Sequence, residues 1–520
     1  MSSMFPDAIA ETDPERIAFV MAGSGEEVTY RELTESSRAI SRLLWSRGLR
    51  HGDTVAIFME NHRALLEVAW AAQRSGMRYV AISSRLTAPE VAYILGDSDT
   101  RAFFCTDALA DTASAAIGVM GPDAPDMPVR AIAGVGTEAS RSAGFETLTA
   151  ALASTPADTE VDEREGVDFL YSSGTTGRPK GVMSPLPLEP LGVPPVFYTI
   201  FYSLWGIAAD SIYLSPAPLF HAAPLRITMA VQRVGGTCII MEHFDPEQAL
   251  ALVEKYRVTH TQMVPAMFVR MLKLPEEVRR RYAVDSLRCV IHAAAPCPIE
   301  AKRAMIDWFG PVIEEYYSAT EGYLFTSITS SQWLEHPGSV GRPIVGVPHI
   351  LGPEGEELPT GEVGQIWSED SPEFEYRNAP EKTAESHDER GWSTVGDIGY
   401  LDEDGYLYIS DRRSDLILRG GVNVYPREAE DALIVDPLVA DAAVFGIPDD
   451  ELGEAVHAVV VPAKGAEPGP ELERTLLDHL YERLAKFKCP QRIEFADSLP
   501  RHATGKLYKR LLRDKYWPQS

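Results

Sequence analysis

One segment of the chain has the residue types needed to hold a polyphosphate. The string Tyr171-Ser-Ser-Gly-Thr-Thr-Gly-Arg-Pro-Lys-Gly181 is rich in glycines and hydroxyl side chains, and it follows an apolar run at residues 167–170 that predicts a strand. Glycines let the backbone approach phosphate oxygens, N–H groups and hydroxyls can donate hydrogen bonds to them, and the lysine adds a positive charge. We therefore predict a nucleotide-binding loop here.

This loop differs from a Walker A motif, which requires G-x-x-x-x-G-K-[ST]. Gly174 is followed five residues later by Pro179, and Lys180 is followed by Gly181. Clusters of Ser, Gly and Thr are most often plain turns, so a shorter fragment would mean little. The full string is far more specific and indicates another class of ATP-using protein.

The string closely resembles the AMP-binding signature of the acyl-adenylate-forming superfamily, which includes acyl-CoA and aryl-CoA ligases, luciferases and the adenylation domains of peptide synthetases. The resemblance spans nearly the whole chain, because further motifs follow in the family's order: Tyr317-Ser-Ala-Thr-Glu321, Gly338-Ser-Val-Gly-Arg-Pro343, Gly391-Trp-Ser-Thr-Val-Gly-Asp397, Asp411-Arg412 with Gly420-Gly421, and Leu499-Pro-Arg-His-Ala-Thr-Gly-Lys506. It implies ATP-dependent activation of a carboxylic acid with release of pyrophosphate, followed by acyl transfer to coenzyme A.

Adenylation brings two anions together, so the site needs a cation, Mg²⁺ and oriented N–H donors where charge develops. The resemblance assigns the cation to Lys506, although Thr-Gly-Lys near a chain end is ordinarily a solvated turn. It assigns Mg²⁺ to Glu321 and an α-phosphate donor to Thr320; the ordinary alternative is a helix N-cap with an acidic first turn. It assigns the ribose hydroxyls to Asp397 and Arg412, although Asp in a glycine-rich turn is usually a turn former.

The resemblance also implies further contacts with the nucleotide and with coenzyme A, from Ser172, Ser173, Gly174, Thr175, Thr176, Gly177, Lys180, Ala295, Pro296, Tyr317, Gly420 and Gly421. The acyl pocket is expected to draw on Leu225, Met229, His292, Ala293, Ala294 and Ser318. The small alanines suggest room for a bulky aromatic, branched or ring-bearing acid. His221 occupies the family's pocket-gating position and is grouped with the catalytic residues, although a lone histidine is more often part of a core.

Two positions depart from the family pattern. Ser318 stands where relatives often have glycine, which would reshape the acyl pocket. Ser414 stands two residues beyond the linker arginine, where relatives usually have Asp or Lys as the pivot of domain rotation. We retain Ser414 as the expected hinge, with an altered rotation equilibrium.

Composition excludes some classes of protein. The net charge of −28 argues against a nucleic-acid partner, which would require clustered Lys and Arg. The five cysteines lack C-x-x-C spacing, so neither a disulfide framework nor a zinc site is predicted, and a reducing cytoplasm fits. The N-terminal residues do not resemble a signal peptide.

The pattern of apolar residues predicts two domains in a chain of 520 residues. Up to residue 410, β-rich runs (55–59, 79–82, 102–105, 238–241 and 289–291) alternate with helical patterns (30–47 and 299–309), which indicates layered α/β sheets that are largely parallel. We expect a large N-terminal domain at 1–410, a hinge linker at 411–415, and a small mobile α+β domain at 416–520. The small domain should contain strands at 442–445, 456–461 and 492–495 and helices at 426–434 and 470–485.

Three other segments have simpler interpretations. Residues 191–209 are uncharged, but Gly192, Pro194 and Pro195 interrupt them, so a buried helix or pocket wall is expected rather than a membrane span. Residues 122–162 are predicted to form a surface excursion. The partial dinucleotide fingerprint at 134–139 is predicted to be a loop, and no G-x-S-x-G motif indicates a serine hydrolase.

The sequence leaves the acyl acceptor open. Coenzyme A is the first expectation, because the glycine pair at 420–421 suits a pantetheine tunnel and the chain has no carrier domain of its own. An amine or a separate carrier protein is the alternative acceptor, and a non-catalytic acyl-adenylate binder is the alternative from another class. A homodimer is also kept open.

Overall fold

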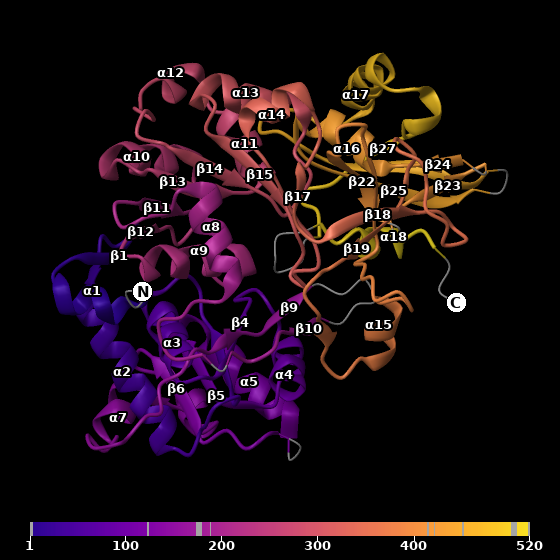
Figure 1. The fold of residues 1–520 in the computed structure, drawn as a ribbon. Helices are drawn as coiled ribbons and strands as arrows, with labels where there is room; N and C mark the ends of the chain where they lie inside the picture. Colours follow the sequence, from indigo (N-terminus) through magenta and orange to yellow (C-terminus); the bar gives the residue numbers. More distant parts are fainter. Residues whose placement is uncertain are drawn as a thin grey trace. The chain divides into compact units, whose positions relative to one another are not determined.

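The computed structural model describes residues 4–121, 124–172, 179–187, 189–412, 415–420, 422–449, 452–500 and 507–517. They form a mixed α/β fold with several sheets (Figure 1), which confirms the predicted fold class. The chain divides into two compact units, unit 1 with residues 1–263, 280–291 and 373–383, and unit 2 with 264–279, 292–372 and 384–520. The predicted domain boundaries at residues 410 and 416 differ from the division between these two units, and they stay a prediction.

Unit 1 contains a parallel six-stranded sheet. Its order is β7 (Glu146–Thr147), β6 (Val129–Ala133), β5 (Thr100–Thr106), β3 (Thr54–Phe58), β4 (Arg78–Ile82) and β8 (Val167–Asp168). All of β3 is buried, as expected for a parallel strand covered on both faces. Helices α4 (Ala88–Asp97) and α5 (Ala110–Met120) pack on these strands through one apolar cluster. The edge strand β8 leads toward the predicted nucleotide loop.

The prediction of a surface excursion at 122–162 is wrong. Strand β6 lies within the sheet, paired in parallel with β5, and Val129, Ala131 and Ile132 are buried. Small residues around it concealed a strand that is buried only because its neighbours cover it. Helices α6 (Glu138–Ser142) and α7 (Leu148–Ala153) follow. The loop predicted at 134–139 is correct only to residue 137, because reciprocal capping by Thr137 and Ser140 starts α6 at Glu138.

A second group of strands in unit 1 is also mainly parallel. Its order is β13 (His260–Met263), β11 (Ile212–Ser215), β12 (Thr237–Ile240), β1 (Ile17–Met21) and β2 (Glu27–Thr29), with only β2 antiparallel to its neighbour. The accompanying helices are α1 (Pro6–Thr12), α2 (Tyr30–Ser46), α3 (Arg63–Arg74), α9 (Ala222–Arg233) and α10 (Pro246–Tyr256). Helix α2 begins at a reciprocal capping box between Thr29 and Glu32.

The uncharged segment at 191–209 contains the helix α8 (Val196–Trp205), whose Tyr198, Phe201 and Trp205 are buried. The predicted helix is therefore present, but only one of its faces is buried, since Val196, Thr199 and Ser203 are exposed. Within the described ranges, the model contains no helix that is both long and apolar enough to cross a bilayer. Tyr202 of α8 donates a hydrogen bond to the Ala230 carbonyl oxygen at 3.1 Å, which fixes α8 beside α9.

Unit 2 begins with helices and antiparallel strands. They are α11 (Pro265–Leu272), α12 (Glu276–Arg279), α13 (Ile299–Phe309), β15 (Ile313–Tyr317), β16 (Phe325–Ile328), α14 (Ser330–Glu335) and β17 (Arg342–Val345). A four-stranded antiparallel sheet follows, in the order β18 (Val347–Leu351), β19 (Gly364–Glu369), β21 (Asp397–Leu401) and β22 (Leu407–Arg412). Strand β14 (Cys289–His292) and helix α15 (Pro380–Glu385) belong partly to each unit.

The last sheet of unit 2 has the order β24 (Val422–Val424), β23 (Ile417–Arg419), β26 (Gly453–Pro462) and β25 (Val439–Asp449), with β27 (Ile493–Phe495) beside β26. Helices α16 (Pro426–Ile434) and α17 (Pro470–Arg483) share an apolar core with these strands, and α18 (Lys509–Arg513) contributes to a second one. The strands and helices predicted for this α+β region are confirmed.

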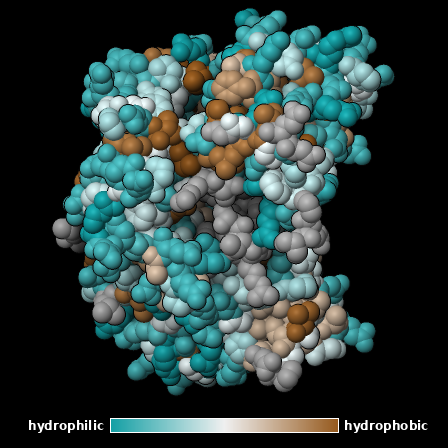
Figure 2. Space-filling view, turned by 90° about the vertical axis from the view of Figure 1, so that its right-hand side faces the viewer, coloured by the Kyte–Doolittle hydropathy of each residue, from teal (hydrophilic) through white to brown (hydrophobic). Residues whose placement is uncertain are grey.

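Hydrophilic residues predominate on the face shown in Figure 2, and hydrophobic residues occur there in separate patches. This distribution agrees with the acidic composition of the chain.

Candidate functional site

Both ends of the predicted phosphate loop are anchored on one β-ladder in unit 1. Strand β9 (Leu170–Ser172) runs antiparallel to β10 (Lys180–Met183), and Lys180 lies opposite Ser172. The predicted contacts between them lie outside the described residues: Ser173, Gly174, Thr175, Thr176 and Gly177. The structure therefore fixes where the loop starts and where it ends.

Lys180 and Gly181 have identifiable structural constraints. The Lys180 Nζ atom lies 4.6 Å from the centroid of the Tyr376 ring, on β20 (Glu375–Tyr376), which pairs with β10. This cation–π contact orients the ammonium. A Cβ atom at Gly181 would come within 2.9 Å of the Phe169 ring and 3.0 Å of the Tyr171 ring, so only glycine fits the base of the hairpin.

Helix α9 carries two of the residues expected at the acyl pocket, and the expected gating residue directly precedes it. His221 precedes the helix as its N-cap in an extended conformation, is half-buried, and has its ring 4.6 Å from that of Phe220. Leu225 and Met229 are fully buried one turn apart. The Tyr79 hydroxyl lies 3.5 Å from the Met229 sulfur. These positions form a contiguous face of one helix.

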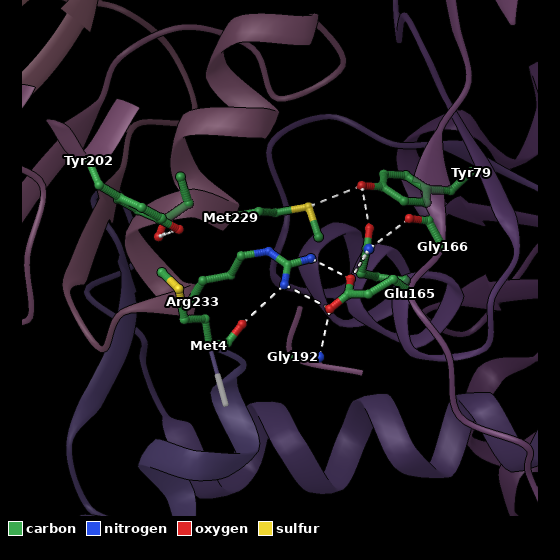
Figure 3. A network of polar contacts seen from close by, with 10 residues as sticks. Met4, Tyr79, Glu165, Gly166, Gly192, Tyr202, Met229 and Arg233 are labelled. Atoms are coloured by element: carbon green, nitrogen blue, oxygen red, sulfur yellow. Dashed lines mark hydrogen bonds and ion pairs between the residues drawn. The ribbon is translucent and has the colours of Figure 1, made fainter. Parts of the chain in front are cut away.

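A buried ion pair ties the end of α9 to the segment before β8 (Figure 3). Arg233 donates from Nη1 and Nη2 to the two Glu165 oxygens at 3.0 and 2.7 Å, and neither side chain is exposed. Gln73 Nε2 and the Gly192 N–H also donate to this carboxylate, at 2.5 and 2.8 Å. Burial lowers the pKa of Arg233, but the Glu165 carboxylate outweighs burial and leaves that pKa above its ordinary value.

A second pair lies nearer the start of α9. Arg226 donates from Nε and Nη2 to Asp168 Oδ2 at 3.0 and 2.7 Å. Asp168 is the last residue of β8, and the side chain of Arg226 keeps 21% of its surface exposed. Burial lowers the pKa of Arg226, and the Asp168 charge more than offsets this effect. Helix α9 is thus held to the β8 segment at two points.

In unit 2, the segment after β14 turns sharply at a predicted pocket position. Ala294 has a backbone φ of +73°, which is uncommon for a residue with a Cβ and indicates a locally strained chain. Ala293 is buried, and the predicted positions Ala294, Ala295 and Pro296 are exposed. His292 at the end of β14 has no exposed surface. The segment therefore passes from the core to the surface within a few residues.

His292 lies beside a buried ion pair. Lys302 Nζ on α13 donates to Glu315 Oε2 on β15 at 2.5 Å, and His292 Nε2 lies 3.5 Å from the same oxygen. Burial, together with the Lys302 charge, holds the pKa of His292 well below its ordinary value, so the imidazole is neutral. Within the described residues, neither ring nitrogen has a hydrogen-bond partner.

Tyr317 and Asp397 are directly joined. The Tyr317 hydroxyl donates to Asp397 Oδ2 at 2.6 Å and lies 2.5 Å from the Tyr323 hydroxyl. Burial, then the Asp397 charge, raise the pKa of Tyr317 well above its ordinary range, so it remains a donor. Arg412 of β22 lies opposite Asp397 of β21 in the strand register. Two predicted ribose-binding positions are therefore paired on adjacent strands.

Thr320 and Glu321 lie in a turn after β15, and the next element is the strand β16, so the helix N-cap interpretation is wrong. Ser318, in the same connection, is half-buried. Within the described ranges, no group of three or more His, Cys, Asp or Glu side chains could hold a metal ion by itself. Mg²⁺ commonly takes one or two carboxylates and completes its shell with phosphate oxygens and waters. A single carboxylate at Glu321 fits a Mg²⁺ that binds together with nucleotide phosphates.

The remaining predicted positions fall near the C-terminus. Gly420 has φ +58° and follows β23, where its N–H donates to the Leu452 carbonyl oxygen at 2.7 Å. Gly421, the hinge residue Ser414 and the predicted catalytic Lys506 lie outside the described residues.

Sequence reasoning did not identify the ion pairs Glu165–Arg233, Asp168–Arg226 and Lys302–Glu315. One signal was present, because Asp168 interrupts an apolar strand, and a buried charge in such a place requires a partner. The partners lie on distant helices, so the sequence gives no means of choosing among many arginines and lysines.

Comparison with known proteins shows similarity over most of the chain. The family model described as AMP-binding enzyme matches residues 6–371, and the model described as AMP-binding enzyme C-terminal domain matches residues 428–506. The chain is 35% identical over 514 residues to the fatty acid–[acyl-carrier-protein] ligase ScoC of Streptomyces coeruleorubidus, covering 95% of this chain and 93% of the relative.

Two further similarities are of interest. The long-chain-fatty-acid–CoA ligase FadD13 of Mycobacterium tuberculosis is 31% identical over 524 residues, covering 98% of this chain and 97% of the relative. The structure of the amide bond synthetase McbA from Marinactinospora thermotolerans superposes with a TM-score of 0.79 at 27% identity, covering 96% of this chain and 97% of McbA.

Proposed function

Because this chain belongs to the AMP-binding enzyme family, we propose that it is an ATP-dependent acid–thiol ligase that converts a carboxylic acid into an acyl-adenylate and then into a coenzyme A thioester. The observation that carries the proposal is the Asp397 carboxylate, which accepts a hydrogen bond from Tyr317 and lies in register with Arg412. A buried, oriented carboxylate beside an arginine position is suited to the two hydroxyls of a ribose.

In the first step, a carboxylate oxygen of the acid attacks the α-phosphorus of ATP, and the bond to the leaving pyrophosphate breaks. The acyl group is then joined to AMP as a mixed anhydride. In the second step, the thiol of coenzyme A loses its proton and attacks the acyl carbon, and AMP leaves. The product is a thioester.

This chain's residues have distinct roles in the first step. The loop from Ser172 to Lys180 binds the phosphates, Thr320 donates to the α-phosphate, and Lys506 stabilises the charge that builds between the two anions. Glu321 would hold Mg²⁺, which neutralises phosphate charge when bound. The hydrogen bond from Tyr317 keeps Asp397 oriented toward the ribose position.

The acyl acceptor distinguishes coenzyme A ligases from two neighbouring activities. FadD13 is named for coenzyme A, ScoC for an acyl carrier protein, and McbA for amide bond formation. We place coenzyme A first, with Gly420 and Gly421 beside its pantetheine arm, and retain an amine or a carrier protein as the alternative. The same proposal includes two domains, at 1–410 and 416–520, that rotate about Ser414, and an acyl pocket that is gated by His221. It also includes a cytoplasmic location and a homodimer.

The test is pyrophosphate release from ATP with a panel of carboxylic acids, in the presence and absence of coenzyme A, with simple amines as separate acceptors. Acid-dependent pyrophosphate release and a coenzyme A thioester are expected. The variant Lys506→Ala should lose about a hundredfold to a thousandfold in adenylation rate while still binding ATP. The exposed Lys464→Ala in a C-terminal turn is the control. An acyl product that forms only with amines would favour the amide synthetase, and no pyrophosphate with any acid would refute the proposal.

A further inference from the structure

The two arginine–carboxylate pairs of α9 lie at matched spacings. Arg226 and Arg233 are seven residues apart, which is about 10.5 Å along a helix. Glu165 and Asp168 are three residues apart, which is about 10 Å in extended chain. Met229 lies between the two arginines on α9, where Tyr79 contacts its sulfur. One face of the helix is therefore tied to the β8 segment at both ends (Figure 3 shows the Arg233 end).

The two pairs differ in their exposed surface and in the hydrogen-bonding atoms that have no partner within the described ranges. Arg233 and Glu165 have no exposed surface, and their network is fully internal. Arg226 is 21% exposed, and both of its hydrogen bonds go to the same oxygen, Asp168 Oδ2. Among the residues that the structure describes, none accepts from Arg226 Nη1 or donates to Asp168 Oδ1. A donor and an acceptor thus remain at one accessible point.

The second pair lies close in sequence to two residues that are predicted to line the acyl pocket. Arg226 follows Leu225 and precedes Met229 by three residues, and both of these are predicted pocket residues. The Phe197 ring, on α8, lies 5.4 Å from the centre of the Arg226 guanidinium and supports its flat face. The pair is therefore held rigidly by Phe197 and the β8 strand, rather than being a mobile surface group.

We propose that Asp168 and Arg226 form a specificity-determining pair that recognises a hydroxyl group on the acyl part of the acid, an inference that rests on the proposed carboxylate activation. A hydroxyl both donates and accepts, so it can donate to Asp168 Oδ1 and accept from Arg226 Nη1. An alkyl group at this point leaves both polar atoms desolvated without a partner. A second carboxylate is attracted by Arg226 but repelled by Asp168. The substrate class is therefore hydroxyl-bearing aromatic or aliphatic acids.

The experiment compares acids that differ in one group. Pyrophosphate release is measured for 4-hydroxycinnamate against cinnamate, and for 6-hydroxyhexanoate against hexanoate and adipate, and the ratios of kcat/KM are taken. The parent should prefer the hydroxy acid of at least one pair by about tenfold or more, because hydrogen bonds to charged groups are stronger than neutral ones.

The variants give the sharper result. Arg226→Met should bring the hydroxy preference close to 1, because the donor to the hydroxyl is lost. Any loss that follows from leaving the Asp168 carboxylate without its counter-charge should lower kcat/KM for the substituted and unsubstituted acids by the same further factor. Asp168→Asn leaves Arg226 uncompensated, so the ratio of adipate to 6-hydroxyhexanoate should rise by about tenfold. Arg226→Lys carries the test if Arg226→Met fails to fold. Arg288→Met, in the exposed Arg288–Asp210 pair of the same unit, is the matched control and should change no ratio.

The outcomes separate the inference from the proposed function. Pyrophosphate release without any hydroxy preference in the parent would overturn the inference and leave carboxylate activation standing. Equal losses for substituted and unsubstituted acids in both Arg226 variants would also overturn it, because they would indicate a packing role. No pyrophosphate release with any acid would overturn the proposed function, and the inference with it.

Discussion

Each compact unit contains a fully buried ion pair beside a segment that is predicted to bind nucleotide, but the two pairs are built differently. In unit 1, the Glu165 carboxylate receives both guanidinium arms of Arg233, the Gln73 amide and a backbone N–H. In unit 2, the Glu315 carboxylate receives the single ammonium of Lys302, with His292 nearby at 3.5 Å.

The difference shows how the choice of cation affects its surroundings. The planar guanidinium of Arg233 fits the carboxylate with two parallel hydrogen bonds and also faces aromatic rings, although its Nε has no hydrogen-bond partner among the described residues. Lys302 is a point charge. Burial, together with that charge, lowers the pKa of the adjacent His292 and keeps its imidazole neutral, and neither ring nitrogen has a hydrogen-bond partner in the described part of the chain. We conclude that the Glu165 carboxylate in unit 1 receives more hydrogen bonds than the Glu315 carboxylate in unit 2.

The largest expected effect is on the Glu165–Arg233 pair. Arg233→Met should lower the free energy of unfolding by about 3–5 kcal/mol, because it leaves the Glu165 carboxylate buried without its counter-charge. Urea unfolding at pH 7, followed by tryptophan fluorescence, measures the change. Arg288→Met removes an exposed pair and should cost no more than about 1 kcal/mol. Similar values for the two variants would contradict the comparison.

Lys302→Met should cost less, and its cost should depend on pH. Burial raises the pKa of Glu315, and Lys302 lowers it, so removing the lysine raises that pKa further. The stranded carboxyl can take up a proton, which limits the loss to about 3 kcal/mol at pH 7 for a group of solution pKa 4.5. A raised folded-state pKa favours the fold below pH 4.5, and this advantage is lost as the pH rises. The deficit relative to the parent should therefore be small at pH 5 and larger at pH 8, and a deficit independent of pH would refute this account.

A third comparison concerns the neutral neighbours. Gln73→Leu removes donors to Glu165 and to the Gly166 carbonyl oxygen, and should cost about 1–3 kcal/mol because buried partners lose their hydrogen bonds. His292→Leu removes a ring without a hydrogen-bond partner among the described residues and should be close to neutral in stability. Unfolding midpoints of both variants measured in parallel decide the matter. An equal cost at both positions would show that the hydrogen bonds of these neutral neighbours do not distinguish the two pairs.

The smallest effect is expected when both members of a pair become apolar. The double variant Arg233→Met with Glu165→Leu should recover most of the stability lost in Arg233→Met alone, because no buried charge remains. Double-mutant cycles at both pairs measure the recovery. Failure to recover would indicate that packing of Arg233 against aromatic rings, rather than charge, dominates.

The elements that were predicted well are those whose boundaries are local. The helix at 299–309 was placed correctly because Pro298 and Gly310 frame it, and the strand at 55–59 was displaced by only one residue at each end. The buried strand β6 was missed, since its burial depends on neighbouring strands far away in the chain. Local sequence signals therefore predict where a helix or strand ends better than they predict whether other elements bury it.

The candidate site divides in the same way. Motif residues such as Asp397 could be named from the resemblance to the family, whereas its hydrogen bond from Tyr317, which is eighty residues away, could not. The neutrality of His292 likewise depends on Lys302 and on burial, neither of which is a property of the local sequence. The roles of the named site residues stay predictions, and their polar partners are what the structure adds.

The register of β21 with β22 has a consequence for recombination between relatives. Arg412 and Asp411 lie opposite Asp397 and Ile398 in one ladder, and Asp411 also accepts from the Arg427 N–H at 3.4 Å. A crossover placed at 410 would join two strands from different parents at the position expected to hold the ribose. A crossover placed after residue 412 keeps that ladder within one parent, and it leaves contacts such as those of Arg427 with Asp411 and with the Ile409 carbonyl oxygen to be matched. Chimeras with the later junction should therefore retain nucleotide affinity more often than those with the earlier one.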